Sequence, residues 1–297
     1  MPHSDSAQAP SSDATSMNHA LITQVRDDIQ TRINCDELVL PTLPEIALQV
    51  REVAEDERAT VPQLAAILAR DPAMSARLVR VSNSPMVRSA VPITDVITAV
   101  SRMGIDFTAN LAIGIAMEQM FQATSDAVDR RLRACWSHSL EVASTAQVLA
   151  RHFTSLPPDQ ALLAGLVHQI GILPLLAYAE DNNELITDAA TLDLVIQKLH
   201  QPLGSLVLRH WEFPAHLVQV TKEYLTFNRA PDAADLTDLI QVATLQSYAD
   251  TQHPLANINS ADVPAFARLG LEVDDDDHQL EAIQEEQQET FAALNNH

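Results

Sequence analysis

The chain has 297 residues, of which 46% are hydrophobic, and a formal net charge of −22 from 18 basic and 40 acidic side chains. Such an acidic surface repels nucleic-acid backbones and anionic lipids on average, so we expect neither as a partner. The hydrophobic share is large enough for a substantial core. Only 6 glycines and 4% aromatic residues favour helices over β-sheet, so we predict an all-α fold.

The first part of the chain indicates a leader followed by short helices. Residues 1–18 are rich in Ser, Asp, Ala and Pro and are predicted to be a disordered leader. Thr60 and Gln63 have the spacing of a capping box, and Asp71 before a proline is a good N-cap. We predict that residues 19–122 form an N-terminal helical bundle. Its helices are predicted over residues 21–33, 44–55, 60–69, 71–83, 95–104 and 107–121.

The polar residues 122–129 mark the predicted boundary to a second helical bundle over residues 129–255. Its helices are predicted over residues 130–153, 158–180, 193–199, 203–211, 215–227 and 235–248. Residues 256–297 form an acidic C-terminal tail with an aspartate run at Asp274 to Asp277. Residues 279–294 have helix-forming composition but a weak apolar face, so we expect an exposed or partner-docked helix.

The cellular compartment is predicted from what the sequence lacks. Cys35 and Cys135 lie far apart and outside any Cys/His cluster, so neither a disulfide framework nor a zinc knuckle is indicated. The N-terminus lacks the basic region and apolar run of a signal peptide, and we expect a cytoplasmic protein. The longest apolar run, residues 161–179, contains a His, a Gln and a Pro, so we predict core rather than membrane insertion.

Residues 162–176 are apolar apart from the central pair His168 and Gln169. The neighbours of His168 repeat at helical spacing, so its imidazole is predicted to lie in or beside the core of a buried helix. A buried polar group costs free energy unless it has a partner. Two partners are open: a hydrogen bond to a neighbouring group, or a metal ion with His138 as the second ligand.

Several ordered motifs resemble the HDOD family, the HD-related output domains of bacterial signalling proteins. They are LPEIA at residues 43–47, LAAILARDPAM at 64–74, LVRVSNS at 78–84, AVSRMG at 99–104 and GLVHQIG at 165–171. The resemblance covers about residues 36–250. It implies an N-terminal helical bundle packed on a degenerate HD-like bundle. It also implies a role downstream of bacterial signals, with links to motility, biofilm or cyclic-dinucleotide control in some relatives.

HDOD domains are similar to HD phosphohydrolases, whose metal site uses an early His, a His-Asp pair and a distal Asp. By this resemblance His138 matches the first His and His168 the His of the pair. Gln169 stands in place of the paired Asp, and Thr244 in place of the distal Asp. The further His residues of HD-GYP phosphodiesterases have no clear counterpart. The four residues are therefore predicted to be vestigial positions of an HD pocket.

Replacing both carboxylates by neutral groups leaves too little negative charge for a tight magnesium or manganese site. Glu141, one helical turn after His138, could join two imidazoles around a zinc ion, but a Glu on an amphipathic helix usually faces solvent. No Walker loop, GxSxG elbow or Rossmann fingerprint occurs. We therefore expect no catalytic residue, no metal and no cofactor.

Asp71, Asn83 and Ser84 form a second, weaker candidate site. They could act as a ligand or partner patch. Each also has an ordinary structural role, since Asp caps helix N-termini and Asn and Ser favour turns. We favour the structural interpretation.

These observations predict a non-catalytic bacterial signal-transduction module that acts through protein–protein contacts. A first rival is a divergent metal-dependent phosphohydrolase acting on a nucleotide or cyclic dinucleotide. A second is a sensor that binds such a ligand without hydrolysing it. Two or three arginines lining a cavity would favour the sensor, because phosphate groups need cationic donors. A protein partner is expected, and a small-molecule ligand stays open.

Overall fold

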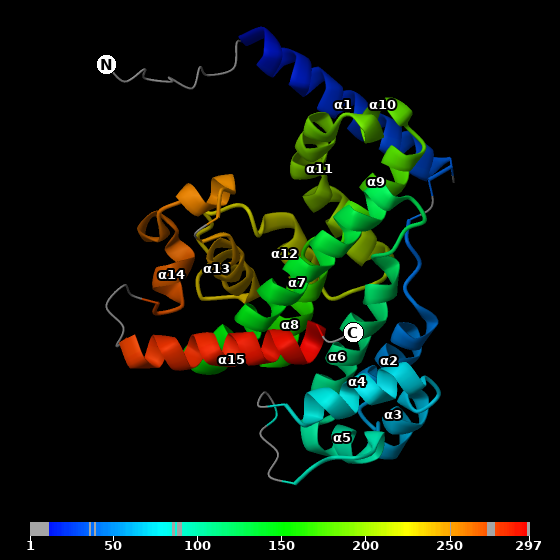
Figure 1. The fold of residues 1–297 in the computed structure, drawn as a ribbon, viewed down its shortest axis with the longest axis vertical. Helices are drawn as coiled ribbons and strands as arrows, with labels where there is room; N and C mark the ends of the chain where they lie inside the picture. The colour runs from blue at the N-terminus through cyan, green and yellow to red at the C-terminus, as the bar shows by residue number, and fades with distance from the viewer. Residues whose placement is uncertain are drawn as a thin grey trace.

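The computed structural model of the protein describes residues 12–35, 37–38, 40–84, 87, 91–249, 251–271 and 277–295. These residues form α-helices and short 3-10 helices and include no strand, which confirms the predicted all-α fold. Figure 1 shows two groups of helices, α2 to α5 at one end and α7 to α14 beyond them, with α6 between.

The helices of the first group begin and end where local sequence favours it. They are α2 (Glu45–Glu55), α3 (Val61–Leu68), α4 (Pro72–Ser82), α5 (Val96–Met103) and α6 (Ile105–Met117), followed by η1 (Glu118–Met120). The carboxylate of Asp71 accepts two backbone N–H groups at 2.9 and 3.0 Å, and the N–H of Thr60 donates to Oε1 of Gln63 at 2.8 Å. Both predicted helix starts are confirmed. Gly104, with φ 86°, turns the chain between α5 and α6.

Helix α1 (Ser12–Asn34) corrects the predicted leader over residues 1–18. The helix begins inside the predicted leader because residues 12–34 contain no glycine or proline that would interrupt it. Residues 1–11 lie outside the described part of the chain. Helix α1 packs against α11, and the hydroxyl of Tyr178 donates to Asp28 at 2.6 Å. The helix therefore lies beside the second group (Figure 1), although residues 19–122 were predicted to form one bundle.

The second group surrounds α8. It consists of α7 (Asp126–Phe153), α8 (Pro158–Val167), α9 (Ile172–Glu180), α10 (Asn183–Thr187), α11 (Ala189–His210), α12 (Ala215–Glu223) and α13 (Leu236–Tyr248). The helix predicted across His168 is interrupted there. The N–H of Ile170 donates to the carbonyl of Val167 at 3.0 Å, and a turn separates α8 from α9.

Helix α11 also differs from the prediction, which placed two helices over residues 193–199 and 203–211. It is continuous through Pro202. A proline inside a helix removes a backbone hydrogen bond and costs about 3 kcal/mol. Because α11 packs against both α9 and α12, the burial of its apolar face offsets that cost.

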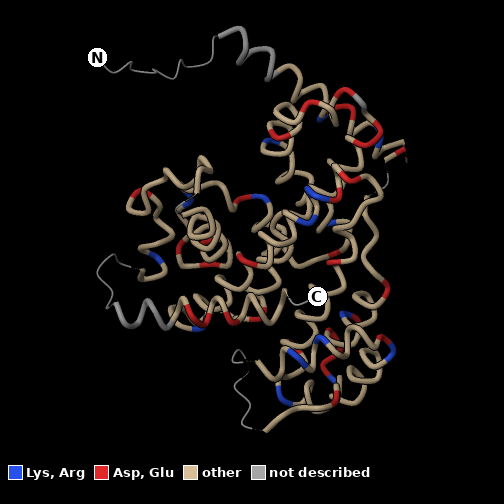
Figure 2. The backbone as a smooth tube through the Cα atoms, viewed as in Figure 1, with Lys and Arg blue, Asp and Glu red and all other residues tan. Residues whose placement is uncertain are grey.

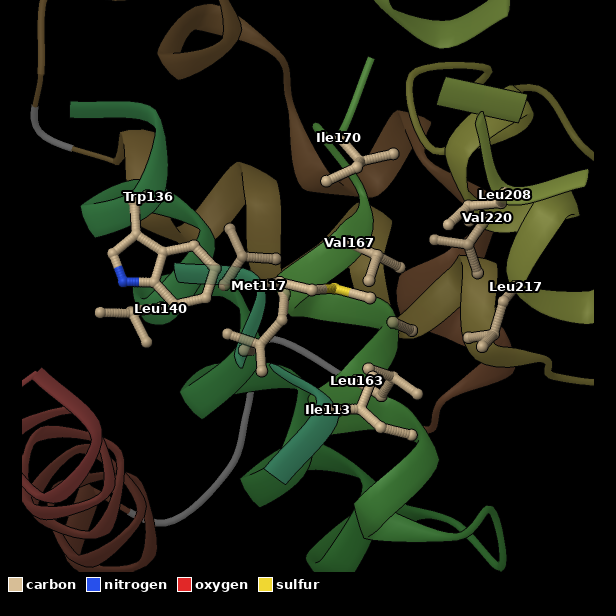
Figure 3. Packing of buried hydrophobic residues seen from close by; sticks show 14 of the residues in the cluster. Ile113, Met117, Trp136, Leu140, Leu163, Val167, Ile170, Leu208, Leu217 and Val220 are labelled. Atoms are coloured by element: carbon tan, nitrogen blue, oxygen red, sulfur yellow. The ribbon is translucent and has the colours of Figure 1, made fainter. Parts of the chain in front are cut away.

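One hydrophobic core runs through both groups. Figure 3 shows Ile113 and Met117 of α6 beside Leu163 and Val167 of α8. Helix α6 also packs against α2, so it joins the first group to the helix that ends at His168. A shift of α8 is therefore coupled to the first group through packed side chains.

The C-terminal part of the chain packs back against the helices that precede it. It contains η2 (Pro254–Asn257), η3 (Ser260–Asp262), α14 (Pro264–Arg268) and α15 (Asp277–Asn295). Helix α15 packs against α7 and α4 of its own chain, with Ile283 and Leu294 buried and Glu286 bound to Arg151 and His152. The expectation of an exposed or partner-docked helix is wrong, because a narrow apolar face and ion pairs suffice to dock it. The first three aspartates of the predicted acidic run lie outside the described residues.

Within the described residues, one helical segment, Pro158–Glu180, and one pair bent by 118°, Val96–Met103 with Ile105–Met120, are long and apolar enough to cross a membrane. In the first, 89% of the apolar window is buried inside the protein. This agrees with the predicted core position. Figure 2 shows Lys and Arg scattered among Asp and Glu rather than gathered on one element.

Candidate functional site

A cavity of about 740 Å³ opens between α7, α9, α11 and α13. Three of the four predicted vestigial residues line it: His138 of α7, Gln169 of the α8–α9 turn and Thr244 of α13. The fourth, His168, is 1% exposed, and its ring centroid lies 5.5 Å from that of His138. The structure therefore brings all four residues to one place.

Two glycines of the GLVHQIG motif allow the helices around this place to approach closely. A Cβ on Gly165 would lie 2.3 Å from Cα of Ala143 in α7, and a Cβ on Gly171 would lie 1.9 Å from the carbonyl oxygen of His200 in α11. No side chain fits at such distances. The motif thus holds His168 and Gln169 against α7 on one side and α11 on the other.

His168 is satisfied at one ring nitrogen by a neighbouring backbone group. Its Nδ1–H donates to the carbonyl of Gly165 at 2.6 Å. Burial, reinforced by electrostatic repulsion from neighbouring His138 and His200 when protonated, lowers the pKa of His168 well below its usual value despite that hydrogen bond. The ring is therefore neutral, with Nε2 as an acceptor. Nε2 is buried and has no hydrogen-bond partner.

His138 belongs to an aromatic stack on the cavity wall. Its ring lies 4.7 Å from Tyr248 at an interplanar angle of 26°, and Tyr248 lies 3.8 Å from His253 at 13°. Burial, together with the neighbouring His253, lowers the pKa of His138 to about 4. Its Nε2 atom is buried without a hydrogen-bond partner.

A second imidazole and phenol pair was missed by the sequence analysis. His200 of α11 donates from Nδ1 to the carbonyl of Ile196 at 2.6 Å, and its Nε2 accepts from the hydroxyl of Tyr224 at 2.6 Å. The Tyr224 ring also lies 4.9 Å from His168. A signal was present, because His200 follows Leu192 by eight residues and Ile196 by four, which are helical spacings, and so lies on an apolar face.

The donor set of the cavity does not fit the divalent metal of HD phosphohydrolases. Oε1 of Gln169 already accepts from the thiol of Cys135 at 3.2 Å, and burial raises the pKa of that thiol to about 12. Thr244 offers only a hydroxyl, and Glu141 is exposed. In the described ranges, no group of three or more His, Cys, Asp and Glu side chains is placed to hold a metal ion.

The charged side chains on the cavity wall form an ion pair with each other. Arg131, the sole arginine on its described wall, pairs with Asp193. A second cavity of about 330 Å³ near the junction of the two groups is also lined by a single arginine, Arg51. Neither of these two cavities gathers the two or three arginines that would favour a nucleotide sensor.

A buried acid on α13, Asp238, was also missed by the sequence analysis, and it forms structural ion pairs. Asp238 is fully buried, and its carboxylate is bound by Arg229 at 3.1 Å and Arg268 at 2.7 Å. It also lies in the first turn of α13, one turn after the N-cap Asp235. Because two arginines occupy Asp238, it supplies no carboxylate to the cavity that Thr244 lines.

The polar side chains of the second candidate site, Asp71, Asn83 and Ser84, form hydrogen bonds within the chain. Asp71 caps α4, and Ser84 donates to the carbonyl of Val81 at 2.7 Å. Asn83 donates to the carbonyl of Ile93 at 2.7 Å and accepts from its N–H at 2.8 Å. These bonds close the loop after α4. A ligand or partner patch at these residues stays a prediction.

Comparison with known proteins decides the family. The family model of the HDOD domain matches residues 40–226, inside the predicted limits. The chain belongs to the HDOD family. An HDOD domain protein with unknown function from Geobacter sulfurreducens has the same fold, with a TM-score of 0.65 and 19% identity over 92% of this chain and 98% of that one.

Two further proteins are similar to this chain. A candidate metal-dependent phosphohydrolase from Shewanella amazonensis SB2B has a TM-score of 0.81 and 29% identity, covering 94% of this HDOD chain and 100% of that one. An uncharacterized protein of Treponema pallidum (strain Nichols) is 23% identical over 207 residues, which are 65% of this chain. The chain spans 39% of the length of that relative.

Proposed function

We propose that this HDOD protein is a non-catalytic signal-transduction module that acts through protein–protein contacts in the bacterial cytoplasm. The proposal rests on one correspondence: by the family resemblance, Gln169 and Thr244 stand at the two positions where an HD enzyme needs carboxylates. An amide and a hydroxyl neither neutralise a divalent cation nor generate a nucleophilic hydroxide from bound water.

The arrangement of helices supplies a route for a signal. His168 and Gln169 follow directly on α8, and α8 packs against α6, which in turn packs against α2. A change at the cavity can therefore alter the packing between the two groups of helices and the surface that a partner protein meets. Such a mechanism needs two discrete packings rather than chemistry.

Metal binding and hydrolysis test the proposal. Purified protein is titrated with Mn²⁺ by calorimetry and assayed for hydrolysis of bis(p-nitrophenyl) phosphate. The wild type is expected to bind no stoichiometric Mn²⁺ and to release no nitrophenol. The double variant Gln169→Asp, Thr244→Asp restores the enzyme-like carboxylates and is expected to bind Mn²⁺ at least tenfold more tightly.

A matched control places the same charges elsewhere. The double variant Gln219→Asp, Gln284→Asp changes two exposed side chains and is expected to bind Mn²⁺ as the wild type does. Stoichiometric metal in the wild type that is lost in both His138→Ala and His168→Ala would overturn the proposal in favour of the phosphohydrolase.

A further inference from the structure

The cavity has an apolar side and an aromatic side. Ile172, Leu176 and Leu255 contribute apolar surface, and the stacked rings of His138, Tyr248 and His253 line the other side. A volume of about 740 Å³ lies within the range of roughly 300–1,000 Å³ typical of small-molecule sites. Its shape and lining are those of a binding pocket rather than of a packing defect.

The described wall of this cavity carries one basic and one acidic side chain, which pair with each other. Of the described lining residues, only Arg131 and Asp193 belong to the Asp, Glu, Lys and Arg types, and they pair with each other. The imidazole of His138 is neutral, and burial raises the pKa of Tyr248 to about 12, so its phenol stays protonated. An anionic or cationic ligand would lose its hydration without gaining a counter-charge.

Polar atoms without partners lie at the same place. Thr244 lines the cavity, is 1% exposed and has an Oγ1 atom without a hydrogen-bond partner. Nε2 of His138, which also lines the cavity, is buried and unpartnered, and so is Nε2 of His168, which is not on the described cavity wall. Buried polar groups are nearly always hydrogen-bonded, so two such atoms on residues of one cavity wall favour a ligand there. A molecule with N–H or O–H groups would satisfy them.

We propose that this cavity binds an uncharged, planar ring compound with at least one N–H or O–H donor. The ring packs between the apolar wall and the side of the stack that His138, Tyr248 and His253 form, and its donor bonds Nε2 of His138, which the protein leaves unpaired. Thr244 supplies a second polar contact. This inference deepens the proposed function, on which it rests, by giving the signalling module a class of input ligand.

Three related probes test the ligand class by calorimetry and saturation-transfer NMR. Indole is planar, uncharged and carries an N–H. Benzofuran has the same shape but an oxygen without hydrogen in its place, and indoxyl phosphate adds a charge and a bond that a phosphatase can cleave. Indole is expected to bind saturably, and both other probes are expected to bind about tenfold more weakly.

Variants locate the site. His138→Phe keeps the ring stack but removes Nε2, and Thr244→Val keeps the shape but removes the hydroxyl. Each is expected to weaken indole binding three- to tenfold, as the loss of one hydrogen bond does. Thr237→Val changes another buried threonine of α13, outside the described cavity wall, and is expected to leave binding unchanged. Circular dichroism checks that each variant is folded.

The outcomes separate the two proposals. No saturable indole binding, equal binding of benzofuran, or tighter binding of uncleaved indoxyl phosphate would each overturn the ligand class and leave the non-catalytic module intact. Cleavage of indoxyl phosphate that His138→Phe abolishes would instead overturn the non-catalytic function.

Discussion

His138 links the chemistry of one residue to the stability of the protein. Its pKa is about 4 in the folded protein and 6.5 for an ordinary histidine. Between these values the unfolded chain binds a proton that the folded protein does not. The contribution of His138 to the free energy of unfolding is therefore complete above pH 6.5 and is lost as the pH falls towards 4.

We predict that the wild type loses roughly 2–3 kcal/mol more stability than His138→Phe between pH 7 and pH 4. Phenylalanine keeps the stack on Tyr248 but cannot bind a proton. Urea unfolding at several pH values measures the difference. Measurements at pH 7.5 serve as the reference, because the imidazole is neutral there in both states. Parallel pH profiles of the two proteins would contradict the assigned cause.

Single residues also show what the sequence could predict about the site. The apolar surroundings of His168 predicted its burial, and the motif resemblance pointed to His138, Gln169 and Thr244 as one pocket. The partner of His168, the carbonyl of Gly165, was not predictable because it depends on where α8 ends. Tyr224 comes from another helix and has no local signal of its own.

At the scale of the elements, close approach between helices decides stability. A Cβ on Gly171 would meet backbone atoms of α11 at 1.9 and 2.4 Å, and backbone atoms cannot yield as a side chain does. We predict that Gly171→Ala lowers the free energy of unfolding by about 3 kcal/mol or more. Urea unfolding followed by circular dichroism measures this loss.

Gly204→Ala is the matched control, because it changes the facing residue in the same contact. Its Cβ would meet its nearest neighbours at 3.3 and 3.4 Å, which is tight but tolerable. Alanine also favours the helix by about 0.5–1 kcal/mol over glycine. A change below about 1 kcal/mol is expected, and equal losses in both variants would contradict the geometric argument.

The docking of α15 depends on few side chains. Leu294 is 2% exposed, and Leu294→Ala is expected to remove about 2–3 kcal/mol of docking free energy. Hydrogen exchange of α15 amides should then accelerate while exchange in α8 stays slow. Leu48→Ala in α2, where the leucine is 41% exposed, is the control and should leave exchange in α15 unchanged. Unchanged exchange of α15 in Leu294→Ala would show that other contacts hold it.

Element boundaries were predictable wherever a local signal set them. The Asp71 cap and the Thr60 capping box depend on residues within one turn, so sequence predicted both helix starts. The continuity of α11 through Pro202 and the docking of α15 depend on contacts with distant helices. The division at residues 122–129 into two domains stays a prediction.

The net charge of −22 acts on the whole molecule. Folding brings like charges together, and their mutual repulsion destabilises the compact state. We predict that the free energy of unfolding rises by about 1 kcal/mol between about 10 mM and 300 mM NaCl, where the Debye length falls from about 30 Å to below 8 Å. Urea unfolding at both salt concentrations measures the change.

Replacing NaCl by KCl at equal ionic strength distinguishes screening from specific ion binding. Equal effects of the two salts are expected. A fall in stability with salt would mean that attractive solvent-exposed ion pairs, such as Arg133 with Asp129, outweigh the general repulsion.

The sequence by itself determined the helical class, the family and the positions of the pocket residues, because composition, periodicity and motif spacing are local properties of the chain. Tertiary structure decided which polar groups of the pocket have a hydrogen-bond or ion-pair partner. Packing of helices distant in sequence paired His200 with Tyr224, left three buried polar atoms unpartnered and balanced Arg131 with Asp193. These are contacts between elements, and only the folded arrangement fixes their distances.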